Sequence, residues 1–88
     1  MKKNSKKVRV GLVQRTAGPD PEENLKKTLE GITQAAKQGA RIVALQELFQ
    51  TRYFPQTEDS RHFDLAEPIP GPATQILSEL ARRQKIVI

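Results

Sequence analysis

The feature that most constrains this chain is a short apolar run, Ile42 to Leu45, which ends abruptly in two polar residues, Gln46 and Glu47. A run of this length between turn signals is typical of a strand that is buried on both faces, as in a parallel sheet. In open α/β folds, ligands bind beyond the carboxyl ends of such strands. The pattern therefore predicts that Glu47 stands where this class of fold places its chemistry. The alternative is a solvated glutamate that merely ends the strand.

The residues before this run predict a strand–helix–strand unit. Apolar residues predict a first strand within Val8 to Gln14. A helix is expected next, because Asp20 is a good N-cap and Pro21 suits the first helical position. Gly39 suits the left-handed residue that follows a helix end. Two strands joined in this way by a helix should be parallel, with a right-handed crossover.

The residues after Glu47 predict a long loop, a second helix and the start of a third strand. No periodicity is seen from Leu48 to Gly71, yet this loop carries all the aromatic residues of the chain: Phe49, Tyr53, Phe54 and Phe63. Disordered linkers are poor in aromatic residues, so a packed loop is expected, with a short helix near Thr57 to His62. Pro72 can start the second helix, and Ile86 to Ile88 is expected to open a third strand.

The predicted fold class is α/β, as an incomplete βαβ-loop-αβ arrangement. Three parallel strands and two helices would leave sheet edges and one sheet face uncovered. The run Ile86 to Ile88 is β-branched and has no turn or polar residue after it. We therefore expect the 88 residues to be the N-terminal part of a longer domain.

The net charge of +5 is located at the start of the chain. The first nine residues supply five of the 15 basic side chains, which leaves 10 basic against 10 acidic groups elsewhere. Residues 1–7 are expected to be a disordered, solubilising tail. The alternative is a tail that contacts phosphate or a membrane surface. Deletion of residues 1–7 would then abolish a salt-dependent binding to nucleic acid.

Composition excludes several classes of site within these residues. There is no cysteine, which excludes disulfides, thiolate metal sites and a thiol nucleophile, and the single histidine leaves little for zinc. No glycine-rich phosphate-binding motif is present. No apolar run is long enough to span a membrane, and no apolar stretch follows the basic start as it would in a secretory signal. A cytoplasmic protein without a metal site is the expectation.

Several segments resemble the start of the nitrilase superfamily of carbon–nitrogen hydrolases. They are the strand at 8–14, the helix start Asn24-Leu25, and the run 39–49, in which a strand ends in Gln-Glu-Leu. The segments 52–56 and 63–72 resemble the N-carbamoylputrescine amidase branch, with β-ureidopropionase-like amidases as near neighbours. The resemblance implies that residues 8–88 are the N-terminal part of a carbon–nitrogen hydrolase domain, whose complete fold is a four-layer αββα sandwich.

The resemblance also implies a Glu-Lys-Cys catalytic set, in which Glu47 matches the glutamate of the family. Glu47 would take the proton from the cysteine thiol and later return one to the leaving amine. The thiolate would attack the carbamoyl carbon, and the lysine would stabilise the tetrahedral oxyanion. No metal or organic cofactor is implied. Tyr53 and Phe54 would line the substrate pocket, with core packing as the alternative role for both.

The chain departs from the family pattern in two respects. It contains no cysteine and no lysine in a matching motif, so it is expected to be inactive alone. Pro55 stands where close relatives would have a cysteine that is not the nucleophile, a difference that bears on the pocket.

The expected partner is a small-molecule carbamoyl amine, without nucleic acid or membrane. The expected reaction is the hydrolysis of N-carbamoylputrescine to putrescine, ammonia and carbon dioxide, in polyamine biosynthesis, by a homo-oligomer of the full-length protein. The alternatives are a β-ureidopropionase-like amidase of other specificity and a non-catalytic α/β binding module.

Overall fold

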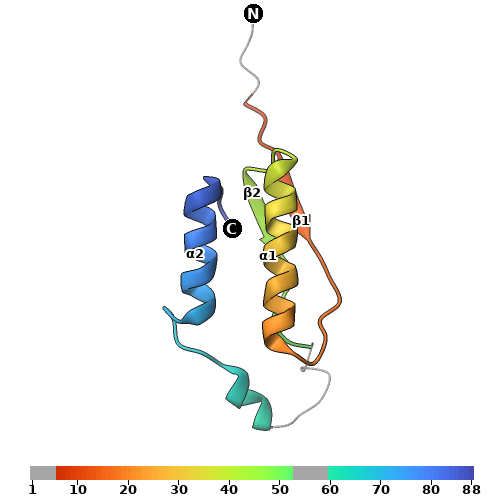
Figure 1. The fold of residues 1–88 in the computed structure, drawn as a ribbon, viewed down its shortest axis with the longest axis vertical. Helices are drawn as coiled ribbons and strands as arrows, with labels where there is room; N and C mark the ends of the chain where they lie inside the picture. Colours follow the sequence, from red (N-terminus) through yellow and green to blue (C-terminus); the bar gives the residue numbers. More distant parts are fainter. Residues whose placement is uncertain (1–5, 53–59) are drawn as a thin grey trace, which may run out of the picture.

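The computed structural model describes residues 6–52 and 60–88. Its elements are β1 (Val10–Val13), α1 (Pro21–Lys37), β2 (Ile42–Leu45), the 3-10 helix η2 (Ser60–Leu65) and α2 (Pro72–Gln84). Both strands run in one direction, and both helices return in the opposite direction (Figure 1). The predicted α/β class and the predicted order of strand, helix, strand, loop and helix are confirmed.

The sheet has β2 at its centre. β1 and β2 pair in parallel, as predicted, and Val10 lies opposite Ile42. On the other side of β2, Val87 forms an isolated parallel bridge with Ile42. The Val43 N–H donates to the Val87 carbonyl at 2.7 Å, and the Val87 N–H donates to the Arg41 carbonyl at 2.9 Å. The third strand predicted at the end of the sequence is thus present only as a bridge.

Both ends of α1 follow the predicted signals. Asp20 is the N-cap, and its side chain accepts a hydrogen bond from the Glu22 N–H at 3.0 Å. Pro21 occupies the first position of the helix. Gly39, two residues past the last helical residue, has a φ of 97°, a left-handed conformation that glycine adopts without steric cost.

Replacing Asp20 with alanine is expected to lower the free energy of unfolding of the complete protein by about 0.5–2 kcal/mol, because an N–H of the first turn loses its acceptor. The measurement is chemical denaturation at equilibrium. Asp20→Asn is the matched control, since asparagine caps about as well as aspartate. Equal stability of the alanine variant and the unmodified protein would contradict the capping role.

The start of α2 is capped in a way that the sequence pattern did not indicate. The helix begins at Pro72 as predicted, but its N-cap residue, Gly71, has no side chain to accept a hydrogen bond. Glu67 supplies the acceptor instead, since its Oε1 receives the Ala73 N–H at 2.7 Å. A carboxylate at a helix N-terminus also interacts favourably with the helix dipole. The loop before α2 is therefore tied to the helix that follows it.

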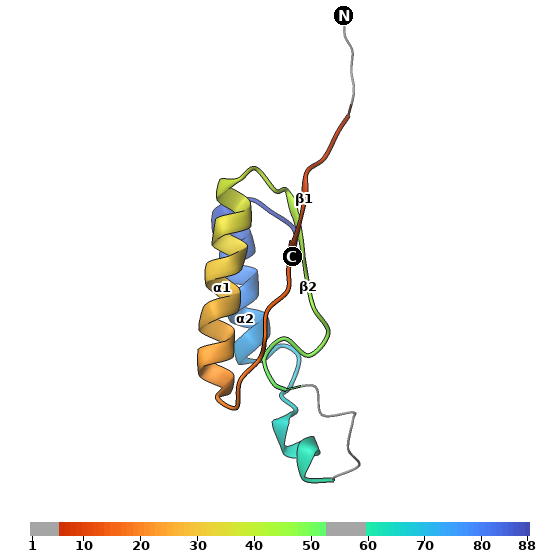
Figure 2. The same ribbon diagram turned by 90° about the vertical axis from the view of Figure 1, so that its right-hand side faces the viewer.

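The core lies between the helices and one face of the sheet. α1 and α2 stand side by side on the same side of the strands (Figure 2). A cluster of five buried residues lies there. Ile32 belongs to α1, Leu80 to α2 and Val43 to β2, while Ala40 precedes β2 and Ile86 follows α2.

The opposite face of the sheet is open. Leu12 is 80% exposed and Val87 is 63% exposed, although both are apolar. This confirms the expectation that one sheet face is uncovered. It also corrects the prediction that β2 is buried on both faces, since Ile42 is 41% exposed and Ala44 is exposed as well. The physical reason is that both helices cover the side of the sheet to which Val43 points, so its neighbours in the strand point away from the core.

The loop between β2 and α2 is described in part. The short helix predicted near 57–62 overlaps η2, which begins at Ser60, while residues 57–59 lie outside the described residues. Of the aromatic residues of the loop, Phe49 is half-buried. Tyr53 and Phe54 lie outside the described residues. In the described parts of the chain, no helix combines the length and the apolar character needed to cross a membrane.

Candidate active site

Glu47 lies two residues beyond the end of β2, at the carboxyl edge of the sheet, as predicted. Because β1 and β2 are parallel, the loop that follows β1 starts at the same edge (Figure 1). The carboxyl edge is where open α/β sheets bind their ligands. The side chain of Glu47 is exposed in the described structure.

A hollow of about 420 Å³ opens at this edge, and Glu47 is part of its wall. One side comes from the loop after β1 and the other from the loop after β2. Its lining is Gln14, Arg15, Ala17, Gln46, Glu47, Leu48, Thr51 and Arg52. We call it the strand-end hollow. Glu47 therefore borders a concave surface, while the two aromatic residues predicted for the pocket, Tyr53 and Phe54, fall outside the described residues.

The side-chain amide of Gln46 joins the two sides of the strand-end hollow. Its Oε1 accepts the backbone N–H of Arg15 at 2.5 Å, and its Nε2 donates to the backbone carbonyl of Arg15 at 2.6 Å. Both capacities of one amide group are thus used on one residue of the neighbouring loop. This amide bridge fixes the backbone of residue 15 beside the residue that precedes Glu47.

Asn24, near the start of α1, makes a second connection between the two loops. It lies in the first turns of α1 and is only 6% exposed. Its Oδ1 accepts the Gly18 N–H at 2.8 Å, and its Nδ2 donates to the Gly18 carbonyl at 2.9 Å. The same Nδ2 donates to the Gln50 carbonyl at 2.9 Å. A buried amide with three hydrogen bonds is satisfied, and its loss would leave backbone groups of both loops without these bonds.

The backbone next to Glu47 adopts an unusual conformation. Leu48 has a φ of 55°, in the left-handed region that residues with a bulky side chain seldom occupy. This conformation costs about 1–2 kcal/mol for a residue with a Cβ. Such a residue persists only where the surrounding structure holds it, and strained positions of this kind cluster at functional sites. Here the bonds of Gln46 and Asn24 act on either side of Leu48.

The charges of the strand-end hollow are mixed. Arg15, Arg52 and Glu47 are the charged residues of its lining. The Arg15 Nη1 also donates to the Lys27 carbonyl at 3.3 Å, which directs this side chain along the start of α1. Guanidinium groups bind carboxylates well through paired hydrogen bonds. Arg52 is therefore the candidate partner for an anionic end of a ligand in this hollow.

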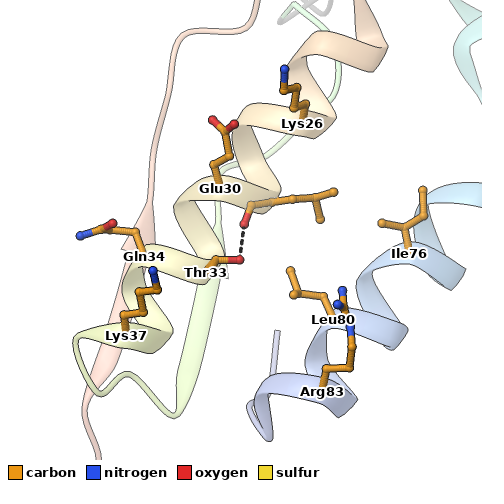
Figure 3. Close-up of a pocket in the computed structure, with 9 residues that line it drawn as sticks. Lys26, Glu30, Thr33, Gln34, Lys37, Ile76, Leu80 and Arg83 are labelled. Atoms are coloured by element: carbon orange, nitrogen blue, oxygen red, sulfur yellow. Dashed lines mark hydrogen bonds between the residues drawn. The ribbon is translucent and has the colours of Figure 1, made fainter.

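A second hollow, of about 410 Å³, lies between α1 and α2 (Figure 3). Its lining includes Lys26, Glu30 and Lys37 of α1 and Leu80 and Arg83 of α2. It is situated in the helical layer and not at the strand ends, so it lies apart from Glu47. Over residues 6–52 and 60–88, no group of three or more histidine, aspartate or glutamate side chains is placed to hold a metal ion.

Sequence reasoning selected Glu47 but missed the two amides that hold its surroundings. In the sequence, Asn24 is notable only within a family resemblance, and Gln46 only as the polar end of a strand. One signal was available in the spacing of the sequence. Asn24, Thr28 and Ile32 are four residues apart, so they share one face of α1, and in the structure this is the buried face. A short amide at such a position is unfavourable in a helix unless it has partners.

Comparison with known proteins gives a family match over most of the chain. Residues 9–88 match the family described as carbon–nitrogen hydrolase. The chain is 41% identical over 80 residues to the omega-amidase NIT2-B of Xenopus laevis, covering 86% of this chain and 26% of that protein. It is 39% identical over 84 residues to the omega-amidase NIT2 of Mus musculus, covering 91% of this chain and 28% of that protein.

A relative from Francisella tularensis is named for a different substrate. The chain is 37% identical over 82 residues to a citrullinase of Francisella tularensis, covering 92% of this chain and 29% of that protein. The chain thus spans between a quarter and a third of the length of the curated relatives that it matches.

Proposed function

Because the chain belongs to the carbon–nitrogen hydrolase family, we propose that the complete protein containing it hydrolyses a carbon–nitrogen bond, with Glu47 as the group that carries the proton. One observation supports this role above the others. Glu47 stands at the carboxyl edge beside the central strand and lines a hollow large enough for a small substrate. The same edge is where this class of sheet binds ligands.

The proposed chemistry requires two groups that these 88 residues do not supply in a matching motif. By the family resemblance, a cysteine is the nucleophile and a lysine stabilises the oxyanion. Glu47 takes the thiol proton, the thiolate adds to the carbonyl carbon of the substrate, and Glu47 returns a proton to the departing nitrogen. Water then attacks the acyl-enzyme, with Glu47 again accepting a proton, and the thiol is restored.

The first substrate candidate is a carbamoylated amine, N-carbamoylputrescine. Support comes from the resemblance of segments 52–56 and 63–72 to that branch of the family. Hydrolysis would yield putrescine, ammonia and carbon dioxide, and so would contribute to polyamine biosynthesis. A β-ureidopropionase-like activity on N-carbamoyl-β-alanine is the neighbouring alternative.

A second candidate is an amide or ureido compound that carries a carboxylate. The observation that favours it is Arg52 in the wall of the strand-end hollow, since a guanidinium group attracts a substrate that carries a carboxylate and repels one that carries an ammonium group. The names omega-amidase and citrullinase agree with this class, because citrulline has a terminal ureido group and a carboxylate.

Ammonia release by the complete protein separates these candidates. The panel is N-carbamoylputrescine, N-carbamoyl-β-alanine, citrulline and succinamate, a simple ω-amide. The highest kcat/KM on N-carbamoylputrescine would support the first candidate. The highest value on N-carbamoyl-β-alanine would support the β-ureidopropionase-like alternative. A preference for citrulline or succinamate that is lost when Arg52 is replaced by alanine would support the second candidate. Failure to release ammonia from all four would favour a non-catalytic α/β binding module.

We further propose that the open face of the sheet is covered in the complete protein by a second sheet, which would produce the four-layer αββα sandwich. The exposed apolar side chains of Leu12 and Val87 support this placement, because a sheet face of this character is normally packed. A cytoplasmic location and a homo-oligomeric state remain parts of the same proposal.

A further inference from the structure

On the condition that Glu47 carries the proton as proposed above, we propose that Asn24 is a positioning residue for it: its buried side-chain amide ties the Glu47 loop to the loop that follows β1. Asn24 does not line the strand-end hollow, so it does not act on the substrate. It acts on the backbone that carries Glu47, through the carbonyl of Gln50 three residues further on.

The structure around Asn24 holds the residue in place. The residue is 6% exposed and lies within α1, whose start is fixed by the Asp20 cap. The Asn24 backbone N–H donates to the Asp20 carbonyl at 3.0 Å, as the first intrahelical bond of the helix. A side chain held by its own helix and by burial has little freedom to follow a moving loop. The loops must therefore adapt to Asn24, and not the reverse.

The bonds of Asn24 reach both loops at once. Two of them close on the N–H and the carbonyl of Gly18, in the loop after β1. The third reaches Gln50, in the loop after β2. Because a single amide group makes all three, the distance between the two loops cannot change without breaking at least one bond.

The segment between the two anchoring points needs this support. Gln46 is held on one side by its amide bridge to Arg15, and Gln50 is held on the other by Asn24. Glu47 and the left-handed Leu48 lie between them. A segment with a strained residue relaxes when one anchor is released, and relaxation here would move the Glu47 backbone directly.

Replacing Asn24 with alanine is expected to lower kcat/KM of the complete protein by about 10- to 100-fold, the loss of activity typical when a catalytic group is displaced from its position. The loss should appear in kcat after correction for the fraction of folded molecules. Hydrogen exchange at the Gly18 amide should become faster in the same variant, because its acceptor is gone. Asn24→Asp is a second variant of the same size, which keeps an acceptor for the Gly18 N–H but loses the bonds donated to the Gly18 and Gln50 carbonyls.

Thr33→Val is the matched control. Thr33 lies on the same helix, and its hydroxyl donates to the Leu29 carbonyl at 2.9 Å, so the variant also loses a side-chain hydrogen bond (Figure 3). That bond stays within α1 and reaches neither loop. The control should keep kcat/KM within about twofold of the unmodified protein and leave exchange at Gly18 unchanged, as expected for a bond that acts on helix stability alone.

Two outcomes separate this inference from the proposed function. If Glu47→Gln is inactive while both Asn24 variants keep the kcat of the unmodified protein per folded molecule, the positioning role of Asn24 is overturned and the base assignment stands. If Glu47→Gln itself keeps near-normal activity, the proposed function is wrong, whatever the Asn24 variants do. Should Asn24→Ala fail to fold, the same comparison is made with Asn24→Asp.

Discussion

Replacing Glu47 with glutamine in the complete protein is expected to lower kcat/KM by about 100- to 10,000-fold, the contribution typical of a positioned general acid–base group. Glutamine has nearly the same size and shape, so it preserves the wall of the strand-end hollow. It cannot accept the thiol proton, and it has no proton of the required acidity to give to the departing nitrogen. The measurement is ammonia release on the best substrate of the panel.

Folding must be unaffected for this result to be informative. Glu47 is exposed and no hydrogen bond or ion pair of its side chain is seen within the described residues, so the melting temperature of the variant should match that of the unmodified protein. Glu23→Gln is the matched control, since Glu23 is also an exposed carboxylate but lies on α1, outside the strand-end hollow. Near-normal turnover by Glu47→Gln would refute the base assignment.

Replacing Ile32 with alanine is expected to lower the free energy of unfolding by about 2–5 kcal/mol, the range for removal of a buried isoleucine side chain in a packed core. Ile32 is fully buried, at 0% exposure, and belongs to the cluster that joins α1 to the covered face of β2. The cost combines lost transfer free energy with the cavity that remains. Equilibrium denaturation of the complete protein measures it.

Ile76→Ala is the control for this second prediction. Ile76 lies on α2 and is 39% exposed, so the same chemical change removes less buried surface. Its cost should be clearly smaller than that of Ile32→Ala, by the usual proportionality between buried apolar area and stability. Equal costs for the two variants would mean that the cluster around Ile32 is not the principal core of this part of the molecule.

The order of elements could be predicted because its signals are local. Asp20 and Pro21 start α1 where the sequence indicated, and Pro72 starts α2. Cap and proline preferences arise from the backbone geometry of one turn, so neighbouring residues are sufficient to reveal them. The burial of β2 was predicted less well, because alternation cannot tell which faces of a short apolar strand are covered until the packing elements are placed.

The hydrogen bonds that hold the candidate site together could not be predicted from local sequence patterns. The amide bridge of Gln46 reaches a residue 31 positions away, and Asn24 reaches Gln50 across 26 positions. No local pattern encodes such a pairing, since it depends on the register of β1 and β2 and on the angle at which α1 crosses them. The position of Glu47 was predictable because it needs only the end of one strand.

The amide bridge of Gln46 touches only the main chain of residue 15. Every amino acid except proline offers the same N–H and carbonyl, so the side chain there is free to vary without disturbing the bridge. Arg15 nevertheless lines the strand-end hollow. The architecture thereby leaves one wall position open to exchange: a designer could screen all replacements at residue 15 for altered ligand preference while the scaffold beneath stays constant.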